Sequence, residues 1–167
     1  MASEAFRGEF YQKVDAKARV SIPAAFRRIL EAEDPSSPEF PRPRVYMVYG
    51  GANRNFVECY SKAGADALAA KIDAMEWGAP ERDRAERELI SRSVMVEIEP
   101  DGRIVLPAKV RAKMGFSDTE AGGEAAFAGY TNRFKLYRRD VYDAEFAEDQ
   151  GGGIDPLALV GRASRAG

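Results

Sequence analysis

The chain has 167 residues, of which 45% are hydrophobic and 31% are charged, and its net charge at pH 7 is −2. These proportions are typical of a folded globular protein, and the length suffices for one ordinary domain or two small ones. No apolar run approaches the roughly 18 residues of a membrane span, and the first ten residues lack the apolar core of a signal peptide.

Histidine is absent and cysteine occurs once, as Cys59. The commonest general base and the commonest transition-metal ligand are therefore missing, so we expect no metal and no cofactor. A single cysteine cannot form an internal disulfide, which favours a reducing cytoplasm. Because Cys59 lies in a strand-like stretch, we expect a buried, inert thiol and not a nucleophile.

The first half of the chain is predicted to contain four strands and one helix. Residues 10–14 and 19–22 are β-prone and flank a short polar turn. A helix is predicted after Pro23, because proline suits the first helical turn. Residues 34–44 hold four of the nine prolines and are predicted to form an extended surface loop. The remaining strands, 44–49 and 55–60, flank a turn rich in glycine and asparagine.

Two helices are predicted next, at residues 65–77 and 81–92, separated by a glycine and a proline. The second alternates acids and arginines at helical spacing, which indicates a solvated, self-paired helix. The pair could be read as a DNA-binding helix-turn-helix, but a half-acidic second helix suits a DNA groove poorly.

The second half repeats the pattern of the first. Strands are predicted at 94–98 and 103–106, a helix from Pro107 to a stop at Gly115, and further strands at 124–128 and 133–137. Residues 14–27 align with residues 98–111 without a gap, at an offset of 84. A pseudo-two-fold axis relating the repeats, with a shared core, would explain how such small units fold.

This repeat divides the chain into four parts. The predicted boundaries are module 1 at 9–63, a helical linker at 64–92, module 2 at 93–141, and a C-terminal helix end with a flexible tail at 142–167. The predicted fold class is mainly β with flanking helices.

The sharpest repeated feature is an acid followed four residues later by arginine: Asp15 with Arg19, and Glu99 with Arg103. One interpretation is a structural ion pair closing each turn, which would contribute little to stability if exposed. The other is a DNA contact, in which the acid orients a guanidinium toward a phosphate or a guanine edge. The two interpretations are compatible.

The local distribution of charge favours the interpretation as a DNA contact. Residues 6–30 contain six basic and two acidic residues, whereas residues 94–115 contain four basic and three acidic residues. Positive charge concentrated in one segment of an acidic chain is typical of an electrostatic footprint on nucleic acid. The first repeat, with Arg19, is therefore predicted to make the main contact, and Arg103 a secondary one. The candidate DNA-binding residues are Arg7, Lys13, Asp15, Lys17, Arg19, Glu99 and Arg103.

Two other classes of function remain open, an enzyme and a protein-interaction module. A carboxylate enzyme would show a deep acidic pocket, but no phosphate-binding loop, serine-nucleophile elbow or metal-spaced cluster occurs, so no enzyme is expected. A protein-interaction ring would show no salt-dependent DNA affinity.

Three motifs together resemble the MraZ family, bacterial regulators associated with the division and cell-wall gene cluster. They are Phe6-Arg7-Gly8, the stretch Asp15-x-Lys17-x-Arg19-x-Ser21-x-Pro23, and the stretch Glu99-x-x-Gly102-Arg103-x-x-x-Pro107. The resemblance covers about residues 6–146. It departs from the family pattern at Ala18, where glycine is usual, and at Glu99, where aspartate is usual.

The resemblance implies two tandem modules similar to the SpoVT/AbrB type, a swapped-hairpin β-barrel. It implies a ring-shaped homo-oligomer, cytoplasmic and nucleoid-associated, that binds short direct repeats of double-stranded DNA upstream of that gene cluster. By position, Arg19 and Arg103 match the family's DNA-binding arginines, Asp15 and Glu99 are their acidic companions, and Lys17 also matches in the first copy.

Overall fold

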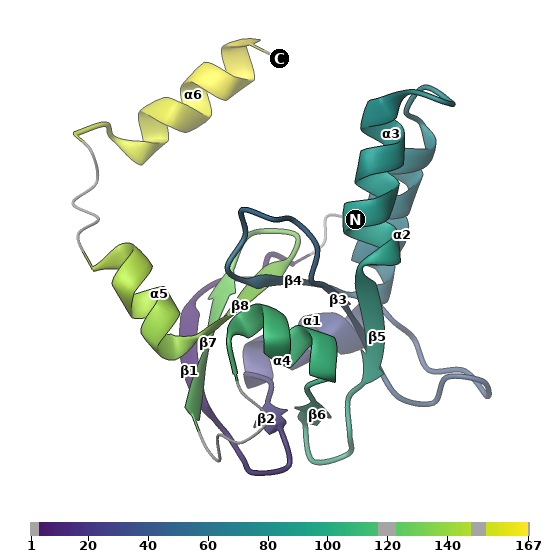
Figure 1. Cartoon of the computed structure of the whole chain (residues 1–167), viewed down its shortest axis with the longest axis vertical. Helices are drawn as coiled ribbons and strands as arrows, with labels where there is room; N and C mark the ends of the chain where they lie inside the picture. The colour runs from purple at the N-terminus through teal and green to yellow at the C-terminus, as the bar shows by residue number, and fades with distance from the viewer. Residues whose placement is uncertain (1–3, 117–122, 148–152, 167) are drawn as a thin grey trace.

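The computed structural model of the chain describes residues 4–116, 123–147 and 153–166. Its centre is an eight-stranded antiparallel sheet that forms a nearly closed barrel with helices around it (Figure 1), which confirms the predicted fold class. The strand order is β5-β3-β4-β8-β7-β1-β2-β6. The strands are β1 (Glu9–Val14), β2 (Arg19–Ser21), β3 (Arg44–Val48), β4 (Val57–Tyr60), β5 (Ser93–Glu97), β6 (Arg103–Val105), β7 (Gly123–Gly129) and β8 (Phe134–Arg138).

Strands from the two repeats interleave in this barrel. β1 of the first repeat pairs with β7 of the second, and β5 of the second pairs with β3 of the first. β2 pairs with its counterpart β6, and β4 pairs with its counterpart β8. The remaining counterparts in the repeat are β1 with β5 and β3 with β7. Exchanging every strand for its counterpart converts the β1–β7 pair into the β5–β3 pair and leaves the β2–β6 and β4–β8 pairs as they are. The repeats are therefore related by a pseudo-two-fold axis and build one barrel together.

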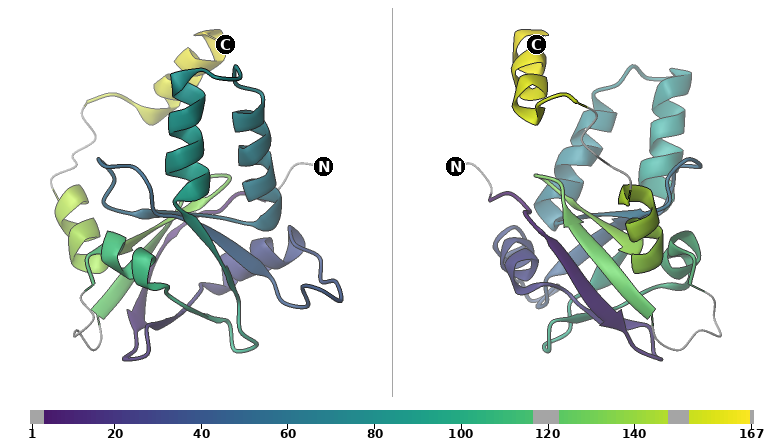
Figure 2. Two further views of the ribbon diagram at one scale, coloured as in Figure 1. Left: turned by 45° about the vertical axis from the view of Figure 1, so that its right-hand side comes forward. Right: turned by 90° about the vertical axis from the view of Figure 1, so that its left-hand side faces the viewer.

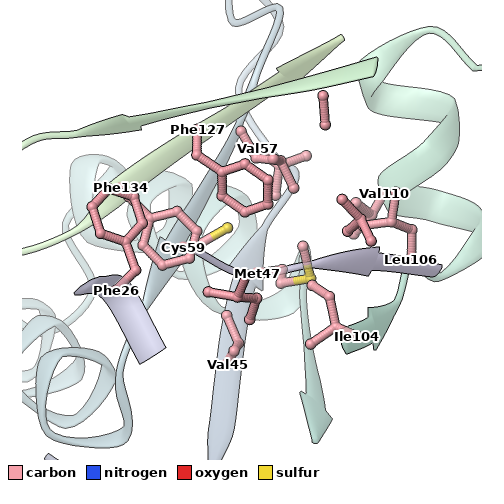
Figure 3. Packing of buried hydrophobic residues seen from close by; sticks show 14 of the residues in the cluster. Phe26, Val45, Met47, Val57, Cys59, Ile104, Leu106, Val110, Phe127 and Phe134 are labelled. Atoms are coloured by element: carbon pink, nitrogen blue, oxygen red, sulfur yellow. The ribbon is translucent and has the colours of Figure 1, made fainter. Parts of the chain in front are cut away.

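The barrel interior is a single apolar core to which both repeats contribute (Figure 3). Val20 and Ile104 face each other across the β2–β6 pair, and each is only 1% exposed. The ring of Phe26 lies 4.9 Å from that of Phe134, in tilted contact. Burial of each such side chain contributes roughly 1.5–3 kcal/mol, so both repeats depend on the shared core. Cys59 is fully buried there, as predicted, and burial raises the pKa of its thiol.

Each repeat has one short helix between its second and third strands. The two helices are α1 (Ala24–Ala32) and α4 (Ala108–Met114), and each follows the predicted proline. Their buried faces carry Phe26, Ile29 and Leu30 in α1, and Val110 and Met114 in α4. Gly115 ends α4 with a φ of 91°, which confirms the predicted helix stop.

A helical hairpin projects from the barrel between the repeats (Figures 1 and 2). It contains α2 (Lys62–Asp73), α3 (Pro80–Ala85) and the π-helix η1 (Glu86–Ser91). Arg82 closes the hairpin by donating hydrogen bonds to the carbonyl oxygens of Asp73, at 3.1 Å, and Met75, at 3.0 Å. The two predicted helices are present, but the second changes to π-helical geometry at Glu86.

The C-terminal region contains α5 (Arg139–Phe146), which packs on the barrel, and α6 (Pro156–Ala166), which lies apart from it (Figure 1). Tyr142 of α5 contacts Tyr137 of β8, with ring centroids 5.1 Å apart. Residues 142–167 were predicted to be a helix end and a flexible tail, so α6 is a helix that the sequence did not predict. None of the helices within the described residues has the length and apolar character needed to cross a membrane.

Candidate nucleic-acid interface

The two repeated signatures form two turns with the same backbone geometry. In the first turn, Asp15 N–H donates to Arg19 O at 3.0 Å, and Ala18 N–H donates to Asp15 O at 3.0 Å. In the second, the equivalent bonds from Glu99 to Arg103 and from Gly102 to Glu99 are both 2.8 Å long. Ala18 has a φ of 62° and Gly102 a φ of 86°. The alanine therefore adopts the left-handed conformation that the usual glycine favours.

The pairing of β2 with β6 brings the two turns together at one end of the barrel (Figure 1). Arg19 lies opposite Val105, and Arg103 lies opposite Ser21. The two arginines are thus diagonal neighbours on the same face of an antiparallel pair, within reach of each other's side chains. The opposite face of the pair carries buried side chains, so the arginines face outward.

The carboxylate of Asp15 organises the first turn. Its Oδ1 accepts hydrogen bonds from the N–H groups of Lys17, at 2.9 Å, and Arg19, at 2.8 Å, and its Oδ2 accepts one from Arg19 Nε at 2.9 Å. The Arg19 N–H above all, then the Arg19 side chain and the Lys17 N–H, lower the pKa of Asp15, although burial opposes this effect. The predicted Asp15–Arg19 ion pair is present through Nε, and the two Nη atoms of Arg19 make no hydrogen bond to any residue that the structure describes.

The second turn differs from the prediction. Within the described ranges, the carboxylate of Glu99 makes no ion pair with Arg103. Arg103 Nη1 instead lies 3.8 Å from Asp15 Oδ2, and its Nε lies 3.7 Å from Asp101 Oδ2. Asp101 Oδ1 also accepts a hydrogen bond from the Arg103 N–H at 3.1 Å, as aspartate commonly does in turns. Asp15 and Asp101 therefore replace Glu99 as the acidic companions of Arg103.

Both arginines line one open hollow of about 440 Å³ on the barrel surface. Lys13 of β1 lines the same hollow, with Asp15 and Glu124 as its acids. The structure thus brings together four of the predicted residues, which are Lys13, Asp15, Arg19 and Arg103.

The other three predicted residues lie outside this hollow. Lys17 is exposed at the first turn itself, and Glu99 is part of the second turn. Arg7 precedes β1, whereas the first turn follows it, so the six-residue strand separates them by roughly 20 Å. The structure does not bring Arg7 to the two-turn end.

Three residues near the turns were not predicted as site residues from the sequence. Asp101 contacts Arg103, and its signal was the Asp-Gly pair of the second turn. Arg27 and Arg42 line a second hollow beside residues 99–102. Neither has a signal in the sequence that points to the second turn, because the interleaved strands create this neighbourhood.

The proteins that resemble this chain do so over most of its length, although no family model matches it. "Transcriptional regulator MraZ" of Cereibacter sphaeroides (strain ATCC 17025) is 47% identical over 164 residues, which cover 95% of this chain and 96% of that protein. The protein of the same name in Ruegeria pomeroyi is 42% identical over 140 residues, covering 84% and 81% of the two chains. A more distant relative, in Parvibaculum lavamentivorans, is 28% identical over 145 residues, 87% of this chain and 83% of that protein.

The match to the Cereibacter sphaeroides protein spans nearly the whole chain, and so includes both turns and the helical hairpin. The Cereibacter sphaeroides and Ruegeria pomeroyi proteins are both named as transcriptional regulators. At this identity and coverage, the chain belongs to the MraZ family of transcriptional regulators.

Proposed function

We propose that the protein regulates transcription by binding double-stranded promoter DNA through its two adjacent turns. The observation that carries this proposal is the position of Arg19 and Arg103 on one outward face, with Asp15 against both of them. A guanidinium held by a carboxylate on one edge can still contact a phosphate or a guanine base with its free edge. The proposed contacts are Arg19 and Arg103, supported by Lys13 and Lys17.

The two turns suit a single stretch of groove. A major groove about 12 Å wide admits a two-stranded β-ribbon, and the β2–β6 pair with its two turns is an element of that kind. Because each turn contributes one arginine, the pair reads more sequence than either turn could alone. In place of a main contact by Arg19 and a secondary one by Arg103, we therefore propose that both arginines act in one DNA contact.

We further propose that several copies of the chain assemble into a ring and bind several short direct repeats at once. Support comes from large apolar side chains that a monomer leaves in solvent, including Trp77, 83% exposed at the hairpin tip, and Leu157 of α6, 78% exposed. Linking several weak contacts in one ring multiplies affinity, by roughly 10² or more. Light scattering checks the assembly, since a single-chain mass at micromolar concentration contradicts the ring.

The predicted parts of the chain have corresponding proposed roles. Modules 9–63 and 93–141 build the DNA-binding barrel, and linker 64–92 connects them as the projecting hairpin. The target would be the promoter of the division and cell-wall gene cluster, which places the working protein in the cytoplasm at the nucleoid. The interleaved strands support two modules of one type.

A selection of bound duplexes from random sequence, followed by fluorescence anisotropy, tests the DNA proposal. Arg19→Ala and Arg103→Ala should each weaken binding to the selected duplex by about 1–3 kcal/mol per engaged site, or roughly 5- to 140-fold, if each arginine reads a base edge. If an arginine contacts only phosphate, its variant should lose affinity equally for all sequences, and the salt slope should fall by about one.

A matched control is Arg84→Ala, which removes one exposed positive charge from α3 in the distant hairpin. It should retain the wild-type affinity. Arg7→Ala tests the separation of Arg7 from the turns, and we expect less than a two-fold effect. A folded Arg19→Ala/Arg103→Ala double variant that binds like the wild type would contradict the proposal, and so would a wild-type protein without salt-dependent DNA affinity, which would favour a protein-interaction ring.

A further inference from the structure

The proline-rich loop between α1 and β3, residues 34–44, is held at both ends by a buried ion pair. Asp34 Oδ2 accepts hydrogen bonds from Arg44 N–H, at 2.8 Å, and Nε, at 3.0 Å, and its Oδ1 accepts one from Nη2 at 2.7 Å. The Arg44 guanidinium also lies 3.9 Å from the centre of the Phe40 ring. The side chains of Asp34 and Arg44 are 3% and 10% exposed. The loop therefore has a defined shape despite its exposed middle.

This loop is attached to the second turn. Ile98 N–H, directly before that turn, donates to Pro43 O at 2.9 Å. Loop, turn and α1 enclose a hollow of about 530 Å³. The polar side chains that line it are Arg27, Arg28, Glu31, Arg42 and Glu99. The second turn thus separates two hollows, one with Arg19 and Arg103 and the other with Arg42.

The cations of this second hollow differ in what they already bind. Arg28 is paired with Glu4 at 3.0 Å. Arg27 lies against the backbone of Gly102. Arg42 is exposed, and no ion pair or hydrogen bond of its side chain occurs among residues 4–116, 123–147 and 153–166. Arg27 likewise makes no ion pair or side-chain hydrogen bond within these ranges, but it is half-buried, whereas Arg42 is exposed and its guanidinium is available to a ligand.

We propose that the loop at residues 34–44 is an additional DNA-binding element, in which Arg42 binds a backbone phosphate beside the groove that the turns enter. A groove about 12 Å wide has phosphates along both edges, so a duplex docked on the second turn presents one edge to the hollow beside it. Arginine binds phosphate through two parallel N–H donors. Since the ion pair and the prolines already order the loop, little conformational entropy is lost on binding.

This inference rests on the proposed DNA-binding function, and its test separates the two. Binding of Arg42→Ala is measured by fluorescence anisotropy on the selected duplex and on an unrelated duplex, at salt concentrations from 50 to 300 mM. A lost phosphate contact should weaken binding to both duplexes by the same factor, about 3- to 10-fold at low salt, and reduce the salt slope by about one. Arg42→Lys, which keeps the charge, should retain the slope.

The Arg84→Ala variant again serves as the control for the loss of one positive charge. An Arg42→Ala variant with the wild-type slope and affinity, in a protein that loses binding on substitution of Arg19 and Arg103, would overturn the role of the loop and leave the proposed function intact. A loss confined to the selected duplex would also overturn it, because phosphate contacts carry no sequence preference. A wild-type protein that binds neither duplex would refute both proposals.

Discussion

The carboxylate of Asp15 lies 2.9 Å from Nε of Arg19 and 3.8 Å from Nη1 of Arg103, so one acid of the first repeat faces the arginines of both repeats. Glu99, its counterpart by sequence, makes no such ion pair within the described part of the chain. The two acids are therefore unequal although the repeat makes them equivalent.

This difference predicts unequal effects on DNA recognition. Asp15→Asn keeps an oxygen acceptor for the turn but removes the charge that orients both guanidinium groups. We expect affinity for unrelated DNA to stay the same or rise, because a negative charge is lost, while preference for the selected duplex falls at least about five-fold, or 1 kcal/mol. Glu99→Gln, the matched control, should change neither quantity by more than two-fold. Anisotropy titrations on both duplexes decide, and equal effects of the two substitutions would contradict the assignment.

The two turns also predict opposite stability effects at equivalent positions. Ala18 and Gly102 both have positive φ, where alanine is strained by about 1–2 kcal/mol and glycine is not. Ala18→Gly relieves this strain but makes the unfolded chain more flexible, so we expect a gain of only about 0.5 kcal/mol. Gly102→Ala should lose about 1–2 kcal/mol, and its added methyl group also meets Arg27.

Urea denaturation followed by circular dichroism measures both free energies of unfolding. The Arg27→Ala/Gly102→Ala double variant serves as a control for the steric part, since removing the guanidinium should recover some of the loss. Shifts of the same sign at positions 18 and 102 would show that the turns are not equivalent.

The pH dependence of stability follows from the carboxylates, because the chain contains no histidine. The hydrogen bonds of Arg44 above all, with its charge, lower the pKa of Asp34 and outweigh the effect of burial. A carboxyl whose pKa is lower in the folded state stabilises the protein fully above its unfolded-state pKa and loses that contribution as pH falls through its folded-state pKa. We expect a free energy of unfolding that stays nearly constant from pH 8 to about pH 5 and falls below it.

Urea midpoints measured across this range test the expectation. Asp34→Asn should lower stability at pH 7 by roughly 3 kcal/mol, because Arg44 is left buried without its charged partner, and should flatten the acid slope. A step in wild-type stability between pH 6 and 7 would be inconsistent with a barrel that lacks histidine.

Interleaved strands predict that neither half of the chain folds as a monomer. Cleavage at Gly78, in the exposed tip of the hairpin, would separate β1, β2, β3 and β4 from their partners in the other half. Residues 1–78 alone should be unfolded, or should form a dimer in which a second copy supplies the missing strands, as the pseudo-two-fold axis allows. An equimolar mixture of the two fragments should recover the far-ultraviolet circular dichroism of the intact chain. A fragment that is folded by circular dichroism and sediments as a monomer would contradict the prediction that each half needs the strands of the other.

The candidate site illustrates how far the sequence could predict this structure. The Asp15–Arg19 pair was predictable because the two residues are only four positions apart and one tight turn brings their side chains together. The contact from Asp15 to Arg103 spans 88 positions and exists only because β2 pairs with β6. The Glu99–Arg103 pair was wrong because Asp101, two residues from Arg103, lies closer to it in the turn.

Arg42 shows the same limit on a larger scale. Its loop was correctly predicted from its prolines, but the loop's place beside the second turn depends on the hydrogen bond between Pro43 and Ile98. Pro43 directly precedes β3 of the first repeat, and Ile98 directly follows β5 of the second. The charge of residues 6–30, which include Arg27 but not Arg42, predicted only that the first repeat makes the main DNA contact. The fold instead places Arg27 and Arg42 beside the second turn.

The sequence by itself determined the strands, the helix starts at the prolines, the doubled turn and the family, because these depend on local backbone preferences and on short motifs. Only the tertiary structure decided that one acid serves two arginines and that a loop of one repeat supports the turn of the other. The physical reason is that residues distant in the chain become neighbours only through strand pairing, which a shared core selects and no local pattern records.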